Sequence, residues 1–475
     1  MTDLLELSAI ELARRIREGD ISSSEVVERH IEEIERVNPR INAVVRNRFE
    51  EARVEAKQAD ARLRTGQAEL PPLLGVPCTI KESIAVVGMP NSSGMVSRGE
   101  LIASQDATVV ARLRSAGAIP LGVTNVSELT VWTATFNRVY GRTNNAYDAR
   151  RIAGGSSGGE GAIVGAGASP FGIGTDLGGS IRAPAFCNGV FGHKPSGGLV
   201  PGTGQFPQYA GRVLRFNTTG PLARRAEDLM PLLRILAGPD GRDEGCLPYE
   251  LGDPDRVDLA SLRVLVIEDD GRRPRVEREL RHAQQRAAYA LARRGASVGP
   301  VSVPDLEHSL SIAGAAIVEA GGTSLDETLG GGERTRLGRE IARLALRRSP
   351  YSYPPLFMLA LERLGRARPR WVRRQAERGA ALRVQLDDLL GEDGVILYPS
   401  GRSVAPRHGP TAPLSLRFFG VFNTLELPVT QVPLGLSAEG LPLGVQVVAG
   451  RGRDHLAIAV ALELERALGG WLPPQ

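Results

Sequence analysis

The sequence predicts an α/β fold, because short apolar runs typical of buried strands alternate with helical stretches. The runs LLGVPCTI, AIPLGV and FGIG are short, apolar and bounded by turn residues, and a helical stretch spans about 107–116. With 475 residues, of which 42% are hydrophobic, the chain can bury a large core. We therefore expect strands and helices packed around a sizeable sheet.

Two helices are expected at the start of the chain. Ser8 and Ser22 are each followed three residues later by a glutamate, which is the spacing of a capping box. After the second serine, an apolar stripe runs from Val27 to Ile34 and ends before Pro39. We expect the second helix to end before this proline.

The second half of the chain begins after a Gly/Pro/Asp-rich passage at 238–258. RVLVIED predicts a strand, a helix follows at about 275–294, and VILYPS and GVQVVAG supply later strands. Between about 305 and 390 the pattern is helical and rich in arginine. We interpret residues 1–475 as one catalytic domain with a helical elaboration at about 305–390.

Positive charge is concentrated in one segment. Residues 334–378 hold 13 arginines against three glutamates, a local charge of +10, although the whole chain carries only +4. The remainder is therefore negative, and aromatic residues make up 5% of the chain, so the sequence disfavours a nucleic-acid-binding protein. Any acidic partner should meet this segment.

The same segment contains an apolar helical face, and two interpretations of it stay open. The first is a helix lying in a membrane interface, which gives a peripheral membrane contact; the second is a solvated helical pair or a homodimer contact. The apolar face consists of Leu356, Phe357, Ala360, Leu361 and Leu364, with Tyr351, Tyr353 and Trp371 nearby.

Nothing in the sequence predicts a membrane span or a disulfide framework. No run of 18 apolar residues occurs, and the N-terminus alternates charge without an apolar core, so we expect a cytoplasmic protein, with the membrane periphery as the alternative. The three cysteines, Cys78, Cys187 and Cys246, lack metal-site spacing. Cys187 is either a nucleophilic thiol or, as buried cysteines usually are, inert.

A glycine-dense stretch at 154–198 is the strongest functional signal. It carries serines at Ser156, Ser157 and Ser180, and apolar residues recur through it. Its glycines therefore permit close packing of the backbone rather than flexibility of the chain. G-x-S-x-G, phosphate-loop and dinucleotide-binding motifs all match poorly, because the preceding strand, the Gly-Lys pair and the G-x-G-x-x-G spacing are missing. The stretch predicts a packed catalytic loop.

Lysine usage adds a candidate base. Of the 58 basic residues only three are lysines, at Lys57, Lys81 and Lys194, and arginine cannot give up its proton near neutral pH. Lys81 follows an apolar run that would bury its stem, whereas Lys57 lies on a polar helix face. Lys81 is therefore the least ordinary of the three.

The order of these motifs resembles the amidase signature family. LLGVPCTIKES, TNVSE, the serine block, LPVTQVPLGL and LPLGVQVVAG follow one another as in that family, and the resemblance weakens only at 235–390. SSGGEGA and FGHKPSGG are most similar to the fatty acid amide hydrolase branch. The resemblance implies a large mixed sheet covered by helices on both faces.

The resemblance also implies a Ser-cisSer-Lys triad. Ser180 would be the nucleophile, Ser156 the bridging serine that follows a cis peptide, and Lys81 the base. A lysine base must be neutral, which requires its pKa to fall by roughly three units, and burial is the expected cause. The remaining implied contacts with substrate are the backbone N–H groups of Leu177, Gly178, Gly179 and Ser180, with Thr130 and Ser157 beside them.

The predicted function is hydrolysis of carboxamides, with an apolar acyl chain as the expected substrate. The mechanism needs no cofactor, and no cluster of residues with metal-ligand spacing is present, so neither a cofactor nor a metal is expected. The alternative within the same fold is the A-type subunit of a glutamine-dependent amidotransferase, which works together with partner subunits.

Overall fold

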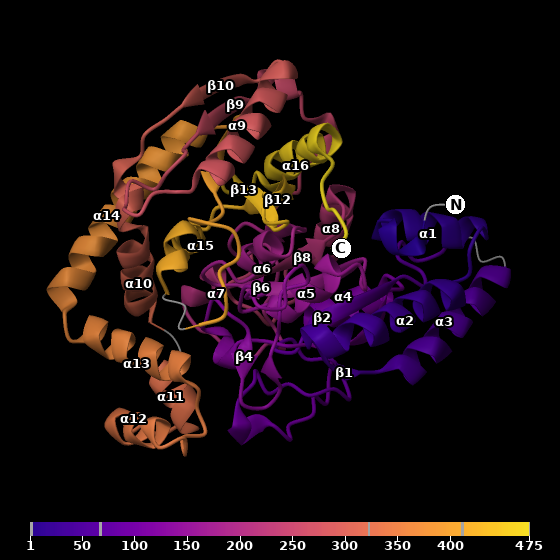
Figure 1. The fold of residues 1–475 in the computed structure, drawn as a ribbon, viewed down its shortest axis with the longest axis horizontal. Coiled ribbons are helices and arrows are strands. Elements are labelled where there is room, and N and C mark those ends of the chain that lie inside the picture. The colour runs from indigo at the N-terminus through magenta and orange to yellow at the C-terminus, as the bar shows by residue number, and fades with distance from the viewer. Residues whose placement is uncertain (1–2, 66–68, 322–323, 410–412, 475) are drawn as a thin grey trace.

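The computed structural model describes residues 3–65, 69–321, 324–409 and 413–474, and a single large mixed sheet runs through this part of the chain (Figure 1). The sheet has eleven strands, and β3–β2–β6 and β11–β9–β10 are its parallel groups. The predicted α/β fold is thus confirmed. In sheet order the strands are β1 (Val44–Asn47), β3 (Ile119–Thr124), β2 (Pro77–Lys81), β6 (Phe171–Asp176), β8 (Thr218–Ala223), β7 (Phe191–Lys194), β12 (Val429–Leu436), β13 (Pro442–Ala449), β11 (Gly394–Pro399), β9 (Arg263–Val266) and β10 (Ser297–Pro300).

The central strands are covered on both faces. Every residue of β2, β3, β6, β8, β7, β11 and β13 is buried, which is the pattern of a sheet enclosed by other elements. A separate two-stranded ribbon is formed by β4 (Phe136–Asn137) and β5 (Gly141–Arg142). The helices outside the 305–390 range are α1 (Ala9–Glu18), α2 (Ser23–Ile41), α3 (Phe49–Arg64), α4 (Thr108–Ser115), α5 (Gly158–Gly165), α6 (Arg182–Cys187), α7 (Val213–Phe216), α8 (Leu229–Leu236), α9 (Arg278–Arg293), α15 (Gly420–Thr424) and α16 (Asp454–Leu468).

The two N-terminal helices begin where the sequence predicts. Ser8 and Ser22 cap α1 and α2, and at Ser22 both reciprocal bonds of a capping box are present. The predicted end of α2 is wrong, because the helix continues through Pro39 to Ile41. A buried stripe from Val26 to Ile41 explains the difference, since packing of this face holds the last turn in spite of the proline.

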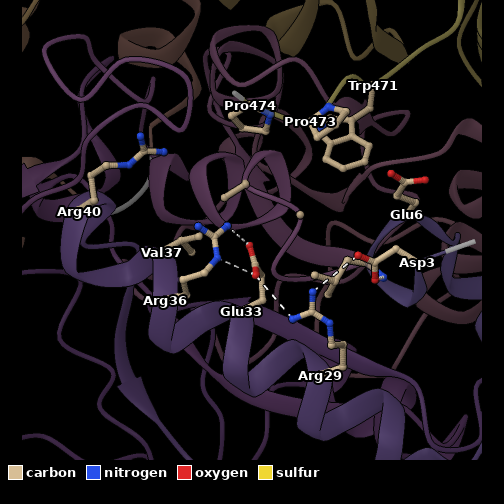
Figure 2. A pocket seen from close by; sticks show the side chains of 13 residues that line it. Asp3, Glu6, Arg29, Glu33, Arg36, Val37, Arg40, Trp471, Pro473 and Pro474 are labelled. Carbon is tan, nitrogen blue, oxygen red and sulfur yellow. Dashed lines mark hydrogen bonds and ion pairs between the residues drawn. The ribbon is translucent and has the colours of Figure 1, made fainter.

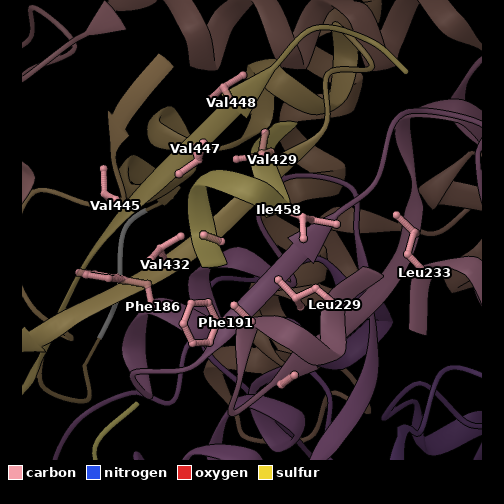
Figure 3. Packing of buried hydrophobic residues seen from close by; sticks show 14 of the residues in the cluster. Phe186, Phe191, Leu229, Leu233, Val429, Val432, Val445, Val447, Val448 and Ile458 are labelled. Carbon is pink, nitrogen blue, oxygen red and sulfur yellow. The ribbon is translucent and has the colours of Figure 1, made fainter. Parts of the chain in front are cut away.

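The main core extends along most of the sheet, from the N-terminal helices and β2 to β13. Figure 3 shows valines of β12 and β13 packing with Ile458 of α16, while Leu229 of α8 and Phe191 of β7 extend the same cluster. The parallel pairing of β2 with β6 matters most for function. It joins Thr79 to Gly172 and Ile80 to Ile173, so the carboxyl ends of both strands, and the loops that follow, meet at one edge.

Helices fill the interval between β10 and β11. They are α10 (Ser309–Ala320), α11 (Leu325–Gly330), α12 (Leu337–Ala345), α13 (Tyr353–Arg366) and α14 (Pro369–Leu390). In Figure 1, α11, α12 and α13 lie at the edge of the molecule, away from the sheet. No helix within the described residues combines the length and apolar character needed to cross a bilayer.

Candidate active site

Lys81 lies at the carboxyl end of β2 and points at two hydroxyl groups. Its Nζ is within 2.7 Å of the Ser156 Oγ and 2.7 Å of the Thr175 Oγ1. The side chain is 0% exposed. The parallel pairing of β2 and β6 produces this geometry, because it brings Thr175 of β6 beside the end of β2.

Burial determines the protonation of Lys81. Loss of hydration lowers the pKa of this amine from 10.5 to about 7, while the carboxylates of Asp176 and Glu160 act in the opposite direction. At neutral pH a substantial fraction of the amine is therefore neutral and able to accept a proton. Burial likewise raises the pKa of Glu160 to about 8. The hydroxyls of Thr79 and Thr124, which donate to its carboxyl group at 2.6 and 2.7 Å, act in the opposite direction.

The first serine pair lies directly against the loop that carries Ser180. The peptide bond between Gly155 and Ser156 is cis. Ser157 donates its backbone N–H to the carbonyl oxygen of Ser180 at 3.2 Å, and its hydroxyl lies 3.3 Å from the carbonyl oxygen of Thr175. Ser156 and Ser157 are fully buried, whereas Ser180 is half-buried. The two serine-bearing segments, distant in sequence, thus form one site.

A buried ion pair supports the loop between β6 and α6. Asp176 and Arg182 are both fully buried, with Nε and Oδ2 3.0 Å apart, and Asn423 bonds to both side chains. The Asp176 carboxylate also accepts the backbone N–H groups of Gly179 and Ile181 at 2.6 and 3.0 Å. Arg182 holds the pKa of Asp176 well below its usual range in spite of desolvation. This pair fixes the turn on which Ser180 lies.

Among the backbone groups expected to bind a developing oxyanion, Gly179 has a different partner. Its N–H donates to Asp176, and its φ of +112° together with the close approach of Phe419 leaves no room for a Cβ atom. The described structure places no protein acceptor at the N–H groups of Leu177, Gly178 and Ser180. These three N–H groups are therefore not engaged by the described part of the protein, while Gly179 shapes the turn.

Thr130 lies at the end of a short 3-10 helix, η3 (Glu128–Thr130). It is half-buried, and its φ is +59°. Ser127, just before η3, donates its N–H to the carbonyl oxygen of Ser156 at 3.2 Å. The segment that carries Thr130 is therefore in direct contact with the serine site.

Sequence reasoning assigned no part in the chemistry to Thr175 or Glu160. Thr175 contacts the Lys81 amine by a hydrogen bond, and Glu160 raises the pKa of that amine only in its ionised form. Thr175 stands immediately before Asp176 in GTDLGGS, and a polar residue at the end of an otherwise apolar strand was the available signal.

Other reactive side chains have structural environments. Burial raises the pKa of the Cys187 thiol to about 12, which leaves it inert. His193 lies between Thr430 and Asp454, with no serine hydroxyl bonded to its ring. Lys194 is also buried, but its Nζ donates to the carbonyl oxygen of Pro195 at 2.7 Å.

A surface cavity of about 490 Å³ lies elsewhere, between α2 and the C-terminal segment (Figure 2). Arg29, Glu33 and Arg36 line it as an ion-pair network beside Trp471. None of the predicted site residues lines this cavity. Within the described ranges, no group of three or more His, Cys, Asp or Glu residues is arranged to hold a metal ion.

Three comparisons relate the chain to known proteins. The sequence profile of the Amidase family matches residues 25–458. Fatty-acid amide hydrolase 2-B of Danio rerio is 45% identical over 99% of this chain and 91% of that protein, and fatty-acid amide hydrolase 2 of Homo sapiens is 43% identical over the same shares. The solved structure of 6-aminohexanoate cyclic dimer hydrolase with its substrate has a TM-score of 0.80 and 28% identity, covering 98% of this chain and 97% of that one.

Proposed function

We propose that this chain, which belongs to the amidase family, hydrolyses hydrophobic carboxamides through an acyl-enzyme on Ser180. Activity as an amide hydrolase follows from the family and from its relatives. The substrate class is the proposal: two relatives that match nearly the full chain are named for fatty-acid amides, so a fatty or other apolar acyl chain is the expected acid part.

The observation that carries the mechanism is the contact between Lys81 and Ser156. A buried amine with a pKa of about 7 lies 2.7 Å from a serine hydroxyl, and that serine is adjacent to the loop of Ser180. A serine hydroxyl is a weak nucleophile until a base removes its proton, and here the neutral amine is the available base. In the proposed relay, Ser156 passes the proton of Ser180 to the Lys81 amine that it contacts.

In the proposed reaction, the Ser180 Oγ attacks the carbonyl carbon while its proton passes to Ser156, whose own proton passes to Lys81. The N–H groups of Leu177, Gly178 and Ser180 stabilise the oxyanion. As the C–N bond breaks, Ser156 returns the proton to the departing amine, since an amide nitrogen is too basic to leave unprotonated. Water then attacks the acyl-enzyme by the same route and releases the acid.

Ser180→Ala tests the nucleophile. The variant should lose turnover of a fatty acyl amide and labelling by a fluorophosphonate probe, because no other hydroxyl is proposed beside the oxyanion donors. Ser261→Ala, which removes an exposed serine far from the loop, serves as the control and should remain active. Full labelling of Ser180→Ala would reject the assignment. Turnover by the wild-type chain alone also separates a hydrolase from a transferase component that needs partner chains.

Peripheral membrane association through residues 334–378 is the second part of the proposal. Leu361 and Leu364 on α13 are 43% and 46% exposed, and Trp371 at the start of α14 is exposed as well. Arg370 and Arg373 are exposed and form no ion pair with any described residue. Apolar side chains, an indole ring and unpaired arginines are what an interfacial helix needs to bind anionic lipid.

One residue of the expected apolar face does not belong to it. Leu356 is 2% exposed and lies in the core, so a charged residue there would disrupt folding rather than membrane binding. Tyr351 and Tyr353 are only half-buried, but they turn toward the protein, where the Tyr351 hydroxyl bonds to the Leu329 carbonyl oxygen and Tyr353 packs on Trp132. The surface for testing is therefore Leu361 with Leu364.

Cosedimentation with vesicles that contain anionic lipid tests this surface. Wild type should sediment at low salt and less at high salt, since each basic residue near an anionic surface is worth about 1 kcal/mol. Leu361→Glu with Leu364→Glu should stay in the supernatant. Val54→Glu with Leu472→Glu, which alters exposed apolar residues elsewhere, should sediment like wild type. If wild type remains in the supernatant at low salt, the membrane proposal is wrong, and the segment is a solvated helical cover or a dimer contact.

A further inference from the structure

The segment from Ser127 to Thr135 supports the bridging serine through its backbone. Besides the bond from the Ser127 N–H to the Ser156 carbonyl oxygen, the Thr135 hydroxyl donates to the Gly154 carbonyl oxygen at 3.0 Å and accepts the Gly158 N–H at 3.0 Å. A Cβ atom on Gly155 would lie 2.5 Å from the Trp132 carbonyl oxygen. The peptide that precedes Ser156 thus rests directly on this segment.

The same segment holds a backbone conformation that its own residues do not favour. Leu129 and Thr130 are consecutive, neither is glycine, and their φ angles are +55° and +59°. Such left-handed residues persist only where surrounding contacts hold them. The Thr130 N–H donates to the Ser127 carbonyl oxygen within the segment at 2.8 Å, and other contacts come from outside it.

The Leu129 N–H donates to the Ser93 carbonyl oxygen at 2.8 Å, and helix α13 supplies further contacts. Glu128, 2% exposed, accepts the backbone N–H of Ser352 at 2.7 Å and also its hydroxyl, and Ser352 is the residue that precedes the first turn of α13. A carboxylate at this place is favoured by the unpaired N–H groups and the positive end of the helix dipole.

Aromatic and apolar contacts reinforce the attachment. The ring of Trp132 meets Tyr353 and Phe357 of α13 edge-on, at centroid distances of 5.5 and 5.9 Å. Leu129 packs with Leu359 of the same helix in a small separate core. Phe357 is partly exposed, so a continuous set of contacts leads from the outer surface of α13 through Trp132 to Gly155.

We propose that Glu128 is a positioning residue for Ser156: by binding Ser352, it fixes the segment 127–135 to α13, and the position of α13 thereby sets the alignment of the bridging serine. This inference rests on the proton-relay role proposed for Ser156. Glu128 itself touches neither the substrate nor the reacting atoms. Glu128 affects the reaction only indirectly, by fixing the position of the peptide that precedes Ser156.

The consequence for catalysis is specific. Ser156 returns a proton to the leaving group, and this step limits an amide more than an ester, whose alkoxide leaves with less assistance. Misalignment of Ser156 should therefore lower kcat for an amide more than for an ester with the same acyl chain. A merely structural role of Glu128 would lower both rates equally, through loss of folded protein.

Ser352→Ala is the primary variant, since it removes one hydrogen bond to Glu128 and leaves the backbone N–H in place. We expect kcat for the amide to fall about tenfold, which is the effect of losing one hydrogen bond to a charged group. The KM for the amide and the kcat for the matched ester should change by less than about twofold, because neither depends strongly on protonation of the leaving group by Ser156. Ser352→Thr, which keeps the hydroxyl, should restore the amide rate.

The chain offers a matched control within the same helices. Ser324 precedes α11 and donates its hydroxyl to Glu362 of α13 at 2.9 Å, and it forms no hydrogen bond with the described 127–135 segment. Ser324→Ala should lower the unfolding temperature as Ser352→Ala does and leave the ratio of amide to ester rates at the wild-type value. Glu128→Gln combined with Ser352→Ala should be no slower than the slower single variant, because both changes break one contact.

The inference is overturned if Ser352→Ala keeps the wild-type ratio of amide to ester rates, or if Ser324→Ala changes that ratio equally. The underlying proposal is tested separately by Ser156→Ala. If Ser156→Ala hydrolyses the amide normally, the relay role fails and the inference fails with it. If Ser156→Ala loses amide turnover but Ser352→Ala does not, only the positioning role of Glu128 is wrong.

Discussion

Replacing Lys81 with methionine should stabilise the protein while abolishing its activity. The substitution keeps the length of the side chain and removes an amine that the fold buries completely. The pKa of about 7, compared with an ordinary 10.5, corresponds to roughly 4 kcal/mol of lost stability at pH 7. The hydroxyls of Ser156 and Thr175 would each lose a partner, at about 1 kcal/mol apiece. Roughly 2 kcal/mol of net stabilisation remains.

The pH dependence gives the prediction its sign. The pKa of Lys81 is lower in the folded chain than in the unfolded one, so between pH 7 and 10.5 the unfolded chain binds the proton and the folded chain does not. Raising the pH in this window therefore stabilises the wild-type fold, and the effect levels off below pH 7. The advantage of Lys81→Met should shrink by roughly 2 kcal/mol between pH 7 and pH 9.

Urea titrations of both proteins at pH 7 and pH 9 measure this difference in the free energy of unfolding. Lys57→Met is the control, because Lys57 is exposed on α3 and its replacement relieves no burial. If Lys81→Met is less stable than wild type at pH 7, or if the difference between them is the same at both pH values, then burial does not hold this amine in its neutral form.

Three further predictions concern the same site. The profile of kcat/KM against pH should fall on the acid side with an apparent pKa near 7, because protonated Lys81 cannot accept a proton; a flat profile down to pH 5 would contradict this. Asp176→Ala should lower the free energy of unfolding by roughly 3–5 kcal/mol, since Arg182 would remain as an unpaired buried charge; a loss below about 1 kcal/mol in urea titrations would show that the pair is not fully buried in solution. Treatment with EDTA should leave amide turnover unchanged, because the proposed relay uses only side-chain and backbone groups; a loss that added zinc restores would overturn the relay.

Much of the fold could be predicted from local patterns. The apolar runs at β2, β3 and β6 were identified correctly, because strands buried on both faces are apolar along their whole length. Ser8 and Ser22 likewise identified the starts of α1 and α2. The resemblance to the amidase signature family, drawn from the order of the motifs, is confirmed by the family match and the relatives.

Which residues are buried could not be predicted as well as the positions of the strands and helices. Pro39 lies inside α2 because the packed face of the helix outweighs the local preference. Leu356 and Leu361 share one helical pattern, yet Leu356 is in the core and Leu361 is exposed. Helical periodicity places residues on a face, but it does not tell which part of that face another element covers.

The sequence by itself determined which residues are candidates for the chemistry. Only three of its 58 basic residues are lysines, and glycines that permit close packing stand beside Ser156 and Ser180. Only the tertiary structure decided how these groups act. Lys81 meets Ser156 and Thr175 across separations of 75 and 94 residues, because β2 and β6 pair in parallel. The pKa of its amine depends on what surrounds it, so the protonation of Lys81 is a property of the packed site and not of the lysine alone.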